Sequence, residues 1–389
     1  MTAITFNADG TDSKVADATK RDWYNYAVQE SLTNTYNEET GEWGTSHWAN
    51  AKLNNNYYVW IPRYAYKIYD DATEDGYVQY TSQLGKSYKI DVKFIGTDVT
   101  QENIATKLGA SYADYIVHPA FTFGTVGETT TPNELSGIWV GKYETSGTAT
   151  APTILPNQVA ATKTTISDLT VAKMFDMAKN VLTSDTQKAE LDAHMMKNTE
   201  WGAVAYLAQS QYGRNGTEIS VNQCSKMITG AGKKEGTNLI YESSLYSTAP
   251  TSEQKYSGKI GKLSSTTGNI YGVYDMSGGA YEYVMGFYGT AENTPTLGST
   301  GFTADTQPER KYYDLYINKT SADSSNIGDA LYETKDWNSD KAYFVYSAYP
   351  VFVRGGDYYG TGNAGAFRFS SDGGGAGNGG GFRVCLAVK

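Results

Sequence analysis

The residue types that most often perform chemistry in proteins are sparse and widely spaced in this chain. Three histidines, His47, His118 and His194, have no partner at metal-ligand spacing, which favours structural or surface roles. The two cysteines, Cys224 and Cys385, form either two buried free thiols or one long-range disulfide, and a metal site would need more ligands. Walker, GxSxG, HExxH and CxxC motifs do not occur. The sequence therefore predicts no catalytic centre and no metal site.

A glycine-rich stretch at residues 351–389 is the strongest candidate for a binding site. It holds 12 of the 41 glycines. Two apolar runs, 351–353 and 382–388, predict strands, because β-branched and aromatic residues dominate them. The residues between the runs have almost no apolar pattern and cannot bury enough surface to hold themselves. We expect a surface loop system pinned by strands at both ends, and loops on a rigid scaffold are where binding usually occurs.

The elements that must position these loops are two helices among many short strands. Residues 168–183 place their apolar side chains on one helical face, with Ser167 or Asp168 as the expected N-cap. Residues 198–209 predict a second helix, in which Glu200 is either a buried acid or a residue on the helix face. The strongest strand signals are 57–69, interrupted by Pro62, 137–144, and two short strands in 268–286. This pattern indicates an α+β fold.

Composition excludes several classes of function. The 389 residues carry a net charge of −10, with a pI near 4.9 and a mean hydropathy of −0.49, which disfavours binding to nucleic acid or anionic lipid. The sequence contains no run of 18 apolar residues that would predict insertion into a membrane. The first residues lack the pattern of a secretory signal. Tyrosine is unusually frequent, with 33 Tyr against 12 Phe. Tyrosine is typical of recognition surfaces, and it also suits half-exposed strands.

Seven ordered motifs resemble the formylglycine-generating-enzyme and sulfatase-modifying branch of the C-type lectin fold. They are VWIP at 59–62, GIWVGKYETSG at 137–147, the helix at 168–183, NTEWGAVAYLA at 198–208, GNIYGVYDMSGGAYEYVMG at 268–286, RGG at 354–356 and GFRV at 381–384. Motif positions fall on Glu144, Glu200, Trp201, Gly272, Tyr274, Asp275, Met276, Gly278, Glu282 and Arg383. The resemblance implies a C-type lectin-like domain at 57–389 with long loop insertions, preceded by an N-terminal appendage at 1–56.

The enzymes of that branch carry paired cysteines after the RGG motif. Here residues 357–368 contain no cysteine, and Cys385 lies beyond GFRV. A thiolate metal centre for oxygen chemistry needs at least two close soft ligands. We therefore expect neither an enzyme nor a bound cofactor. An oxidase of this type with altered chemistry remains the alternative.

The C-terminal stretch resembles more closely the variable proteins of diversity-generating retroelements. In that family adenines are randomised in AAY codons, which can become codons for Asp, Tyr, Gly, Ser or Arg but never for Lys, Glu, Gln, Met or Trp. Residues 357–381 contain none of those five types. The resemblance implies a variable region at about 346–383, with Gly362, Ala364, Gly365, Phe367 and Phe369 as constant scaffold. A glycine-rich loop that merely tolerates drift is the competing interpretation.

The candidate ligand-binding residues belong to this variable region, and we expect them to form one changeable face. They are Asp357, Tyr359, Gly360, Arg368, Ser370, Ser371, Asp372, Gly373, Gly375, Gly377, Asn378, Gly379 and Gly380. Arg368, Ser371, Asp372 and Asn378 should be exposed, whereas Trp201, Tyr274 and Phe382 should lie in the core. Neighbouring scaffold or constant asparagines such as Asn363 should supply hydrogen bonds to the glycine-rich run.

The resemblance implies a receptor-binding display protein, either at a bacteriophage tail tip or as an adhesin on a bacterial surface. The expected partner is a host-cell surface protein or glycan, with other tail or surface-structure proteins as further partners. Without a signal sequence, a place on the virion is favoured over the cell surface. An inert structural subunit of a tail or pilus is a further alternative.

Overall fold

The computed structural model describes residues 1–7, 9–26, 46–81, 85–123, 133–235, 245–319, 326–360, 363–375 and 377–389. Within them the chain has an α+β fold, in which antiparallel strands predominate and helices are few. Gly362, expected as a constant scaffold position, lies outside the described residues. No helix in the described part of the chain is long and apolar enough to cross a membrane.

The first sheet has seven strands, all paired antiparallel. Their order is β14 (Leu191–Met195), β21 (Val384–Val388), β11 (Gly137–Gly141), β4 (Asn56–Pro62), β3 (Asn50–Leu53), β1 (Thr2–Phe6) and β2 (Asp12–Lys14). Residues 1–56, predicted to be an appendage, thus supply three strands that extend the sheet beyond β4. Proline lacks a backbone N–H, and β4 ends at Pro62 as predicted.

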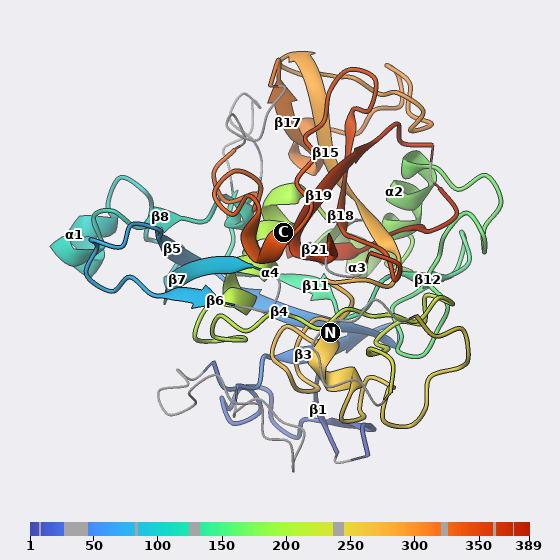
Figure 1. The fold of residues 1–389 in the computed structure, drawn as a ribbon, viewed down its shortest axis with the longest axis horizontal. Coiled ribbons are helices and arrows are strands. Elements are labelled where there is room, and N and C mark those ends of the chain that lie inside the picture. Colours follow the sequence, from blue (N-terminus) through green and yellow to red (C-terminus); the bar gives the residue numbers. More distant parts are fainter. Residues whose placement is uncertain are drawn as a thin grey trace.

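The second sheet carries the C-terminal strands and forms the upper part of Figure 1. Its order is β16 (Thr294–Pro295), β15 (Tyr281–Ala291), β18 (Val351–Gly355) and β19 (Gly365–Asp372). Two further strands, β17 (Asp314–Ile317) and β20 (Gly380–Phe382), pair with β15 in parallel. The long strand β15 therefore pairs with segments from residues 294–317, from residues 351–355 and from residues 380–382.

Smaller sheets and short helices complete the fold. A four-stranded sheet has the order β6 (Gln79–Thr81), β7 (Lys86–Phe94), β5 (Tyr64–Tyr69) and β8 (Ile116–Val117). Two-stranded pairs join β9 (Thr122–Phe123) to β10 (Asn133–Glu134) and β12 (Ser146–Gly147) to β13 (Pro152–Thr153). The short helices are α1 (Ile104–Leu108) and α3 (Asp185–Glu190).

The two longer helices lie on opposite faces of the seven-stranded sheet. Helix α2 (Val171–Lys179) shares one core cluster with Tyr58, whereas α4 (Asn198–Gln209) shares the other with Val59 and Ile61. Alternate side chains of β4 thus serve two cores, as the period of a strand requires. Every residue of α4 is buried.

The predicted start of the first helix is wrong. Asp168 has a φ of 55° and lies outside the helix. The N-cap is Thr170, whose hydroxyl accepts a hydrogen bond from the backbone N–H of Lys173 at 3.4 Å. The second helix has the predicted bounds, and Trp201, Tyr274 and Phe382 are confirmed as core positions at 0% exposure.

The two cysteines are both buried and free, so the disulfide left open by the sequence is not formed. Cys385 lies in β21, opposite His194 of β14. Burial raises the pKa of both thiols. Neither thiol is therefore set up as a reactive thiolate.

Candidate ligand-binding face

The stretch predicted to be a loop system contains an eight-residue strand, β19. It pairs antiparallel with β18, so that Val351 lies opposite Asp372 and Arg354 opposite Phe369. The register then shifts, because the next pair joins Gly355 to Gly365. Three residues of β19 between these pairs have no partner on β18, which bends the edge of the sheet.

Side chains on one side of β19 anchor it to the core. Phe367 packs edge-on against Trp337 at 5.1 Å between ring centroids, and Phe369 is fully buried. The backbone carbonyl of Ala366 accepts a hydrogen bond from the indole N–H of Trp201 at 2.7 Å. The two phenylalanines therefore occupy the scaffold role expected of them, and the strand is held at its centre.

The residues that alternate with these rings are less exposed than predicted. Ser370 is only 9% exposed, and Arg368 and Asp372 are half-buried. Arg368 lies beneath a turn whose Gly356 and Gly360 leave room for its guanidinium, since an added Cβ at either glycine would crowd Nη1. Burial lowers the pKa of Arg368, against the charges of two nearby aspartates. Arg368 therefore supports the turn rather than projecting from it.

Asp372 also has a fixed role at the end of β19. Its Oδ1 accepts a hydrogen bond from the hydroxyl of Tyr283 at 2.6 Å and another from the backbone N–H of Gly374 at 2.8 Å. These bonds turn the chain out of the strand and explain why Asp372 is half-buried. Ser371 is half-buried as well, and only Asn378 is exposed as predicted.

The glycine-rich run after β19 crosses the side of the sheet that carries Tyr281 and Tyr283. An added Cβ at Gly377 or Gly380 would meet these two tyrosines, which shows how closely the run lies on them. Gly380 is buried and pairs with Tyr281 as part of β20. The run thus crosses this side of the sheet, as predicted.

Neighbouring scaffold supplies hydrogen bonds to this run, as predicted, but Asn363 does not supply them within the described residues. The carbonyl of Gly373 accepts a bond from the backbone N–H of Ser299 at 2.7 Å, and the carbonyl of Asn378 accepts one from the hydroxyl of Thr164 at 2.8 Å. Asn363 instead accepts a weak bond from the N–H of Lys341 at 3.5 Å through its own carbonyl. Neighbouring loops therefore fix the backbone together with Asp372, which accepts the N–H of Gly374.

Three glycines of the run have room for a side chain. An added Cβ at Gly373 meets nothing within 4 Å, and at Gly375 it meets only the side chain of Ser299 at 3.4 Å. At Gly379 the nearest atom belongs to Tyr281 at 3.6 Å. None of these glycines has a left-handed backbone, whereas Gly374 between them has a φ of +86° and lies against Thr300. Open and closed positions therefore alternate along the run.

Four exposed tyrosines surround the strand edge. Tyr359 is 69% exposed, and Tyr343, Tyr349 and Tyr346 are 60%, 48% and 42% exposed. The last three belong to the segment 341–349, which runs beside β19. There the backbone N–H of Tyr343 donates to the carbonyl of Phe369 at 3.1 Å. Exposed aromatic side chains in one region commonly mark an interaction surface.

Sequence reasoning missed part of this tyrosine segment, which begins before the predicted variable region. Lys341 and Tyr343 precede it, and the ammonium of Lys341 lies 4.4 Å from the centroid of the Tyr343 ring. The overall excess of tyrosine was the available signal, but it could not place these residues next to β19. We call residues 341–349, 357–360 and 368–380 the C-terminal face.

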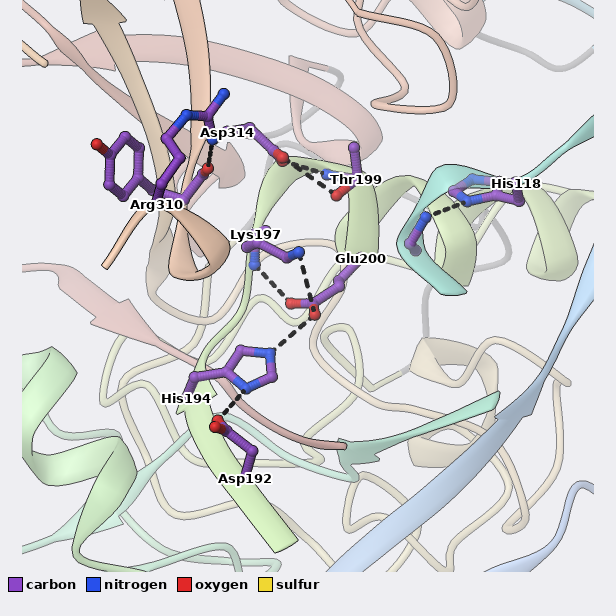
Figure 2. Close-up of polar contacts among 10 residues, drawn as sticks. His118, Asp192, His194, Lys197, Thr199, Glu200, Arg310 and Asp314 are labelled. Atoms are coloured by element: carbon purple, nitrogen blue, oxygen red, sulfur yellow. Dashed lines mark hydrogen bonds and ion pairs between the residues drawn. The ribbon is translucent and has the colours of Figure 1, made fainter. Parts of the chain in front are cut away.

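A second group of polar residues lies buried at the start of α4 (Figure 2). His194 Nε2 is 2.8 Å from Glu200, and Nδ1 is 3.2 Å from Asp192. Burial alone would lower the pKa of His194, but the two carboxylates outweigh it and raise that pKa to about 9. Since His194 and Glu200 are 0% exposed, the group ties β14 to α4 and has no access to a ligand.

Other motif residues also stabilise the fold. The guanidinium of Arg383 donates to the carboxylate of Glu282 and to the carbonyls of Gly141 and Tyr274. Asp275 accepts a bond from the backbone N–H of Gly230 at 2.8 Å. All these side chains are buried and join separate strands and loops, so these motif positions contribute to the architecture.

His118 is buried and caps a short turn, since its Nδ1 accepts a bond from the N–H of Ala120 at 3.3 Å. Burial lowers the pKa of His118 to about 3, so the ring is neutral. His47 stacks on Tyr271 at 4.2 Å between ring centroids. In the described ranges, no three His, Cys, Asp or Glu side chains are grouped so that they could hold a metal ion.

No protein-family model matches this chain, and no curated protein sequence matches it. The C-terminal face combines exposure, aromatic content and open backbone positions, whereas the group around His194 is closed. The C-terminal face is the better candidate for a functional site.

Proposed function

We propose that this chain is a ligand-binding display protein with a C-type lectin fold, and that a retroelement diversifies its C-terminal region at about 346–383. The observation that carries the proposal is the alternation of open and closed positions after β19. Gly373, Gly375 and Gly379 have room for other side chains, while Gly374 between them needs a left-handed backbone. Residues at the open positions can therefore be substituted while the backbone of the run keeps its conformation.

The scaffold beneath the run suits this role. Trp201 and Phe367 hold β19, and Asp372 fixes the turn that follows it. A binding surface gains affinity when its backbone is ordered before the ligand arrives. A rigid strand edge that carries replaceable side chains provides that order.

The exposed tyrosines of the C-terminal face are suited to supply much of the binding energy. Tyrosine offers a large amphipathic contact area at a low cost in conformational entropy. Tyr343 stands outside the predicted variable region and Tyr359 inside it, so constant and changeable aromatic side chains lie on the same face. The partner that we propose is a host-cell surface protein or glycan, bound by a tail tip of a phage or by an adhesin on a bacterial surface.

We propose that the protein is not an enzyme. Its two thiols are far apart, buried and raised in pKa, which does not suit thiolate chemistry. The alternative, an oxidase related to the formylglycine-generating enzyme, predicts turnover of a cysteine peptide. That turnover would vanish with Cys224→Ser or Cys385→Ser, and observing both results would replace our proposal.

An exchange of residues 357–380 between variants tests the display function. We expect the exchange to change which cell or purified receptor is bound, while the melting temperature changes little, because the exchanged side chains stand on a scaffold held from outside. An exchange of the exposed residues 303–306 is the control and should leave the partner unchanged. If binding ignores the first exchange, the face is inert, as in a structural tail or pilus subunit. A near-copy of the DNA that encodes the variable region, located beside a reverse transcriptase gene, would independently support diversification by a retroelement.

A further inference from the structure

A second concave site lies away from β19, where residues 21–26 pack against the seven-stranded sheet. It is a groove of about 720 Å³, within the range of ~300–1,000 Å³ that is common for ligand pockets. Its walls come from the N-terminal segment, from β4 and β11, and from the end of β7. The lining includes Trp23, Tyr24, Tyr26, Trp60, Phe94 and Trp139.

The aromatic walls of this groove are held in place. Trp60 and Trp139 are direct cross-strand neighbours on β4 and β11, with ring centroids 5.1 Å apart. The hydroxyl of Tyr26 donates to the carbonyl of Trp60 at 2.7 Å and accepts the N–H of Ala49 at 3.1 Å. The N-terminal segment, which forms one wall of the groove, is therefore hydrogen-bonded to β4, which forms part of the opposite wall.

The groove is also lined by polar groups that can form hydrogen bonds or an ion pair with a ligand. Neither Trp60 nor Trp139 makes an indole hydrogen bond to any residue that the structure describes, although both side chains are half-buried. Asn25 adds an exposed amide. Among the lining residues that the structure describes, Arg21 is the one charged side chain, in a chain whose net charge is −10. The site thus combines flat apolar walls, hydrogen-bond donors and a single positive charge.

We propose that this groove binds a saccharide that carries a carboxylate. The C–H faces of a sugar ring can pack on the indole walls, while its hydroxyl groups accept hydrogen bonds from the two indole N–H groups. The guanidinium of Arg21 pairs well with a carboxylate. A proline-rich peptide also favours aromatic grooves, but its proline residues offer no negative charge to Arg21.

Titration of the full chain with sialyllactose, with digalacturonate and with neutral lactose tests the inference, with tryptophan fluorescence and calorimetry as readouts. We expect at least one acidic probe to bind more tightly than lactose. Trp139→Ala should weaken that binding by about tenfold or more, a loss of ~1.4 kcal/mol. Arg21→Gln should remove the preference for the acidic sugar and leave lactose binding unchanged. Tyr332→Ala, at an exposed position outside the groove, is the matched control and should bind normally.

Absence of binding by both acidic probes at about millimolar concentration would overturn the inference. So would binding that is indifferent to Arg21→Gln and Trp139→Ala, or saturation of the groove by a proline-rich peptide in preference to the sugars. A circular dichroism melt of each variant separates loss of binding from loss of fold, and Trp139→Phe provides a milder change if Trp139→Ala unfolds. The chain with residues 357–380 exchanged should retain the saccharide, so this site and the C-terminal face succeed or fail independently.

Discussion

Neighbouring glycines in the sequence differ in their backbone conformation and in the space around them. Gly374 has a left-handed φ of +86° and lies against Thr300, whereas Gly375 has neither constraint. A left-handed backbone strains any residue with a Cβ, by on the order of 1–2 kcal/mol. Composition predicts a glycine-rich binding region at residues 351–389. It could not separate fixed from replaceable glycines, because that depends on φ and on atoms distant in the sequence.

Two neighbouring substitutions test this distinction. We expect Gly374→Ala to lower the free energy of unfolding by about 1–3 kcal/mol, since the alanine adds both backbone strain and a contact with Thr300. Gly375→Ala should change that free energy by no more than about 0.5 kcal/mol. Urea denaturation of both variants measures the difference. Equal losses would show that the run does not distinguish open from closed positions.

His194 is a charged residue that the structure keeps out of water. It lies between Glu200 and Asp192, and its raised pKa of about 9 means that the folded chain holds this proton more tightly than the unfolded chain. The stabilisation is fully present below the ordinary histidine pKa of 6.5 and is lost as the pH rises to about 9. The shift corresponds to about 3 kcal/mol.

A comparison of the wild type with His194→Gln isolates this contribution. The variant should be less stable at pH 6, and the gap between the two proteins should narrow by about 3 kcal/mol between pH 6.5 and 9. Guanidinium denaturation at several pH values gives both curves. A gap that stays constant with pH would mean that the imidazole is neutral in the folded protein.

At the scale of elements, the sequence predicted best where local and tertiary signals agree. Helix α4 has its predicted bounds, and the carboxylate of Glu200 accepts the backbone N–H of Lys197 at 2.8 Å at its first turn. Strand β19 was expected as loop because glycine and serine dilute its apolar pattern. The alternation of Phe367 and Phe369 was the one correct local signal, and pairing with β18 determined the rest.

The segment 341–349 shows what sequence could not place. Its tyrosines became part of the candidate site only through hydrogen bonds to β19, such as that from Tyr343 to Phe369. Nothing in the spacing of residues 341–349 predicts that contact. The part of this segment that precedes the proposed variable region, which includes Tyr343, supplies constant aromatic area next to the changeable positions. The constant and the changeable residues should therefore contribute differently to binding.

Replacing Tyr343 with serine tests that division. We expect the variant to weaken binding by more than tenfold for every exchanged version of residues 357–380, because an exposed aromatic anchor serves all ligands. The choice among ligands should stay the same. Tyr332→Ser, which removes an exposed tyrosine elsewhere, is the control. A change of preference rather than of strength would assign Tyr343 to specificity.

At the scale of the whole molecule, the fold buries several acids that retain protons. Burial raises the pKa of Asp275 to about 6 and that of Asp329 to about 7, although Arg383 and Arg354 oppose the two shifts. Burial likewise raises the pKa of Glu282 and Asp340. Each group binds its proton more tightly in the folded chain than in the unfolded chain.

The sign of the resulting pH dependence follows from linkage. Stability falls with rising pH wherever the folded state holds more protons than the unfolded state, by about 1.4 kcal/mol per pH unit for each proton. For Asp275 and Asp329 this window extends from about pH 4 to about pH 7. Glu200 acts in the opposite direction, because neighbouring charges overcome burial and lower its pKa to about 2, so its contribution is lost as the pH falls from 4.5.

We therefore expect the free energy of unfolding to be greatest near pH 4–5 and to decline toward neutral pH. Asp329→Asn should make that decline less steep, by the contribution of about one titrating proton. The amide of the variant does not titrate, but it can still form hydrogen bonds with Tyr316 and Leu331. Asp336→Asn, at an exposed position nearby in sequence, is the matched control and should leave the slope unchanged. Denaturant melts between pH 4 and 8 measure all three curves. Stability that rises steadily from pH 5 to 8 would contradict the prediction, since it requires the buried acids to be ionised in the folded protein.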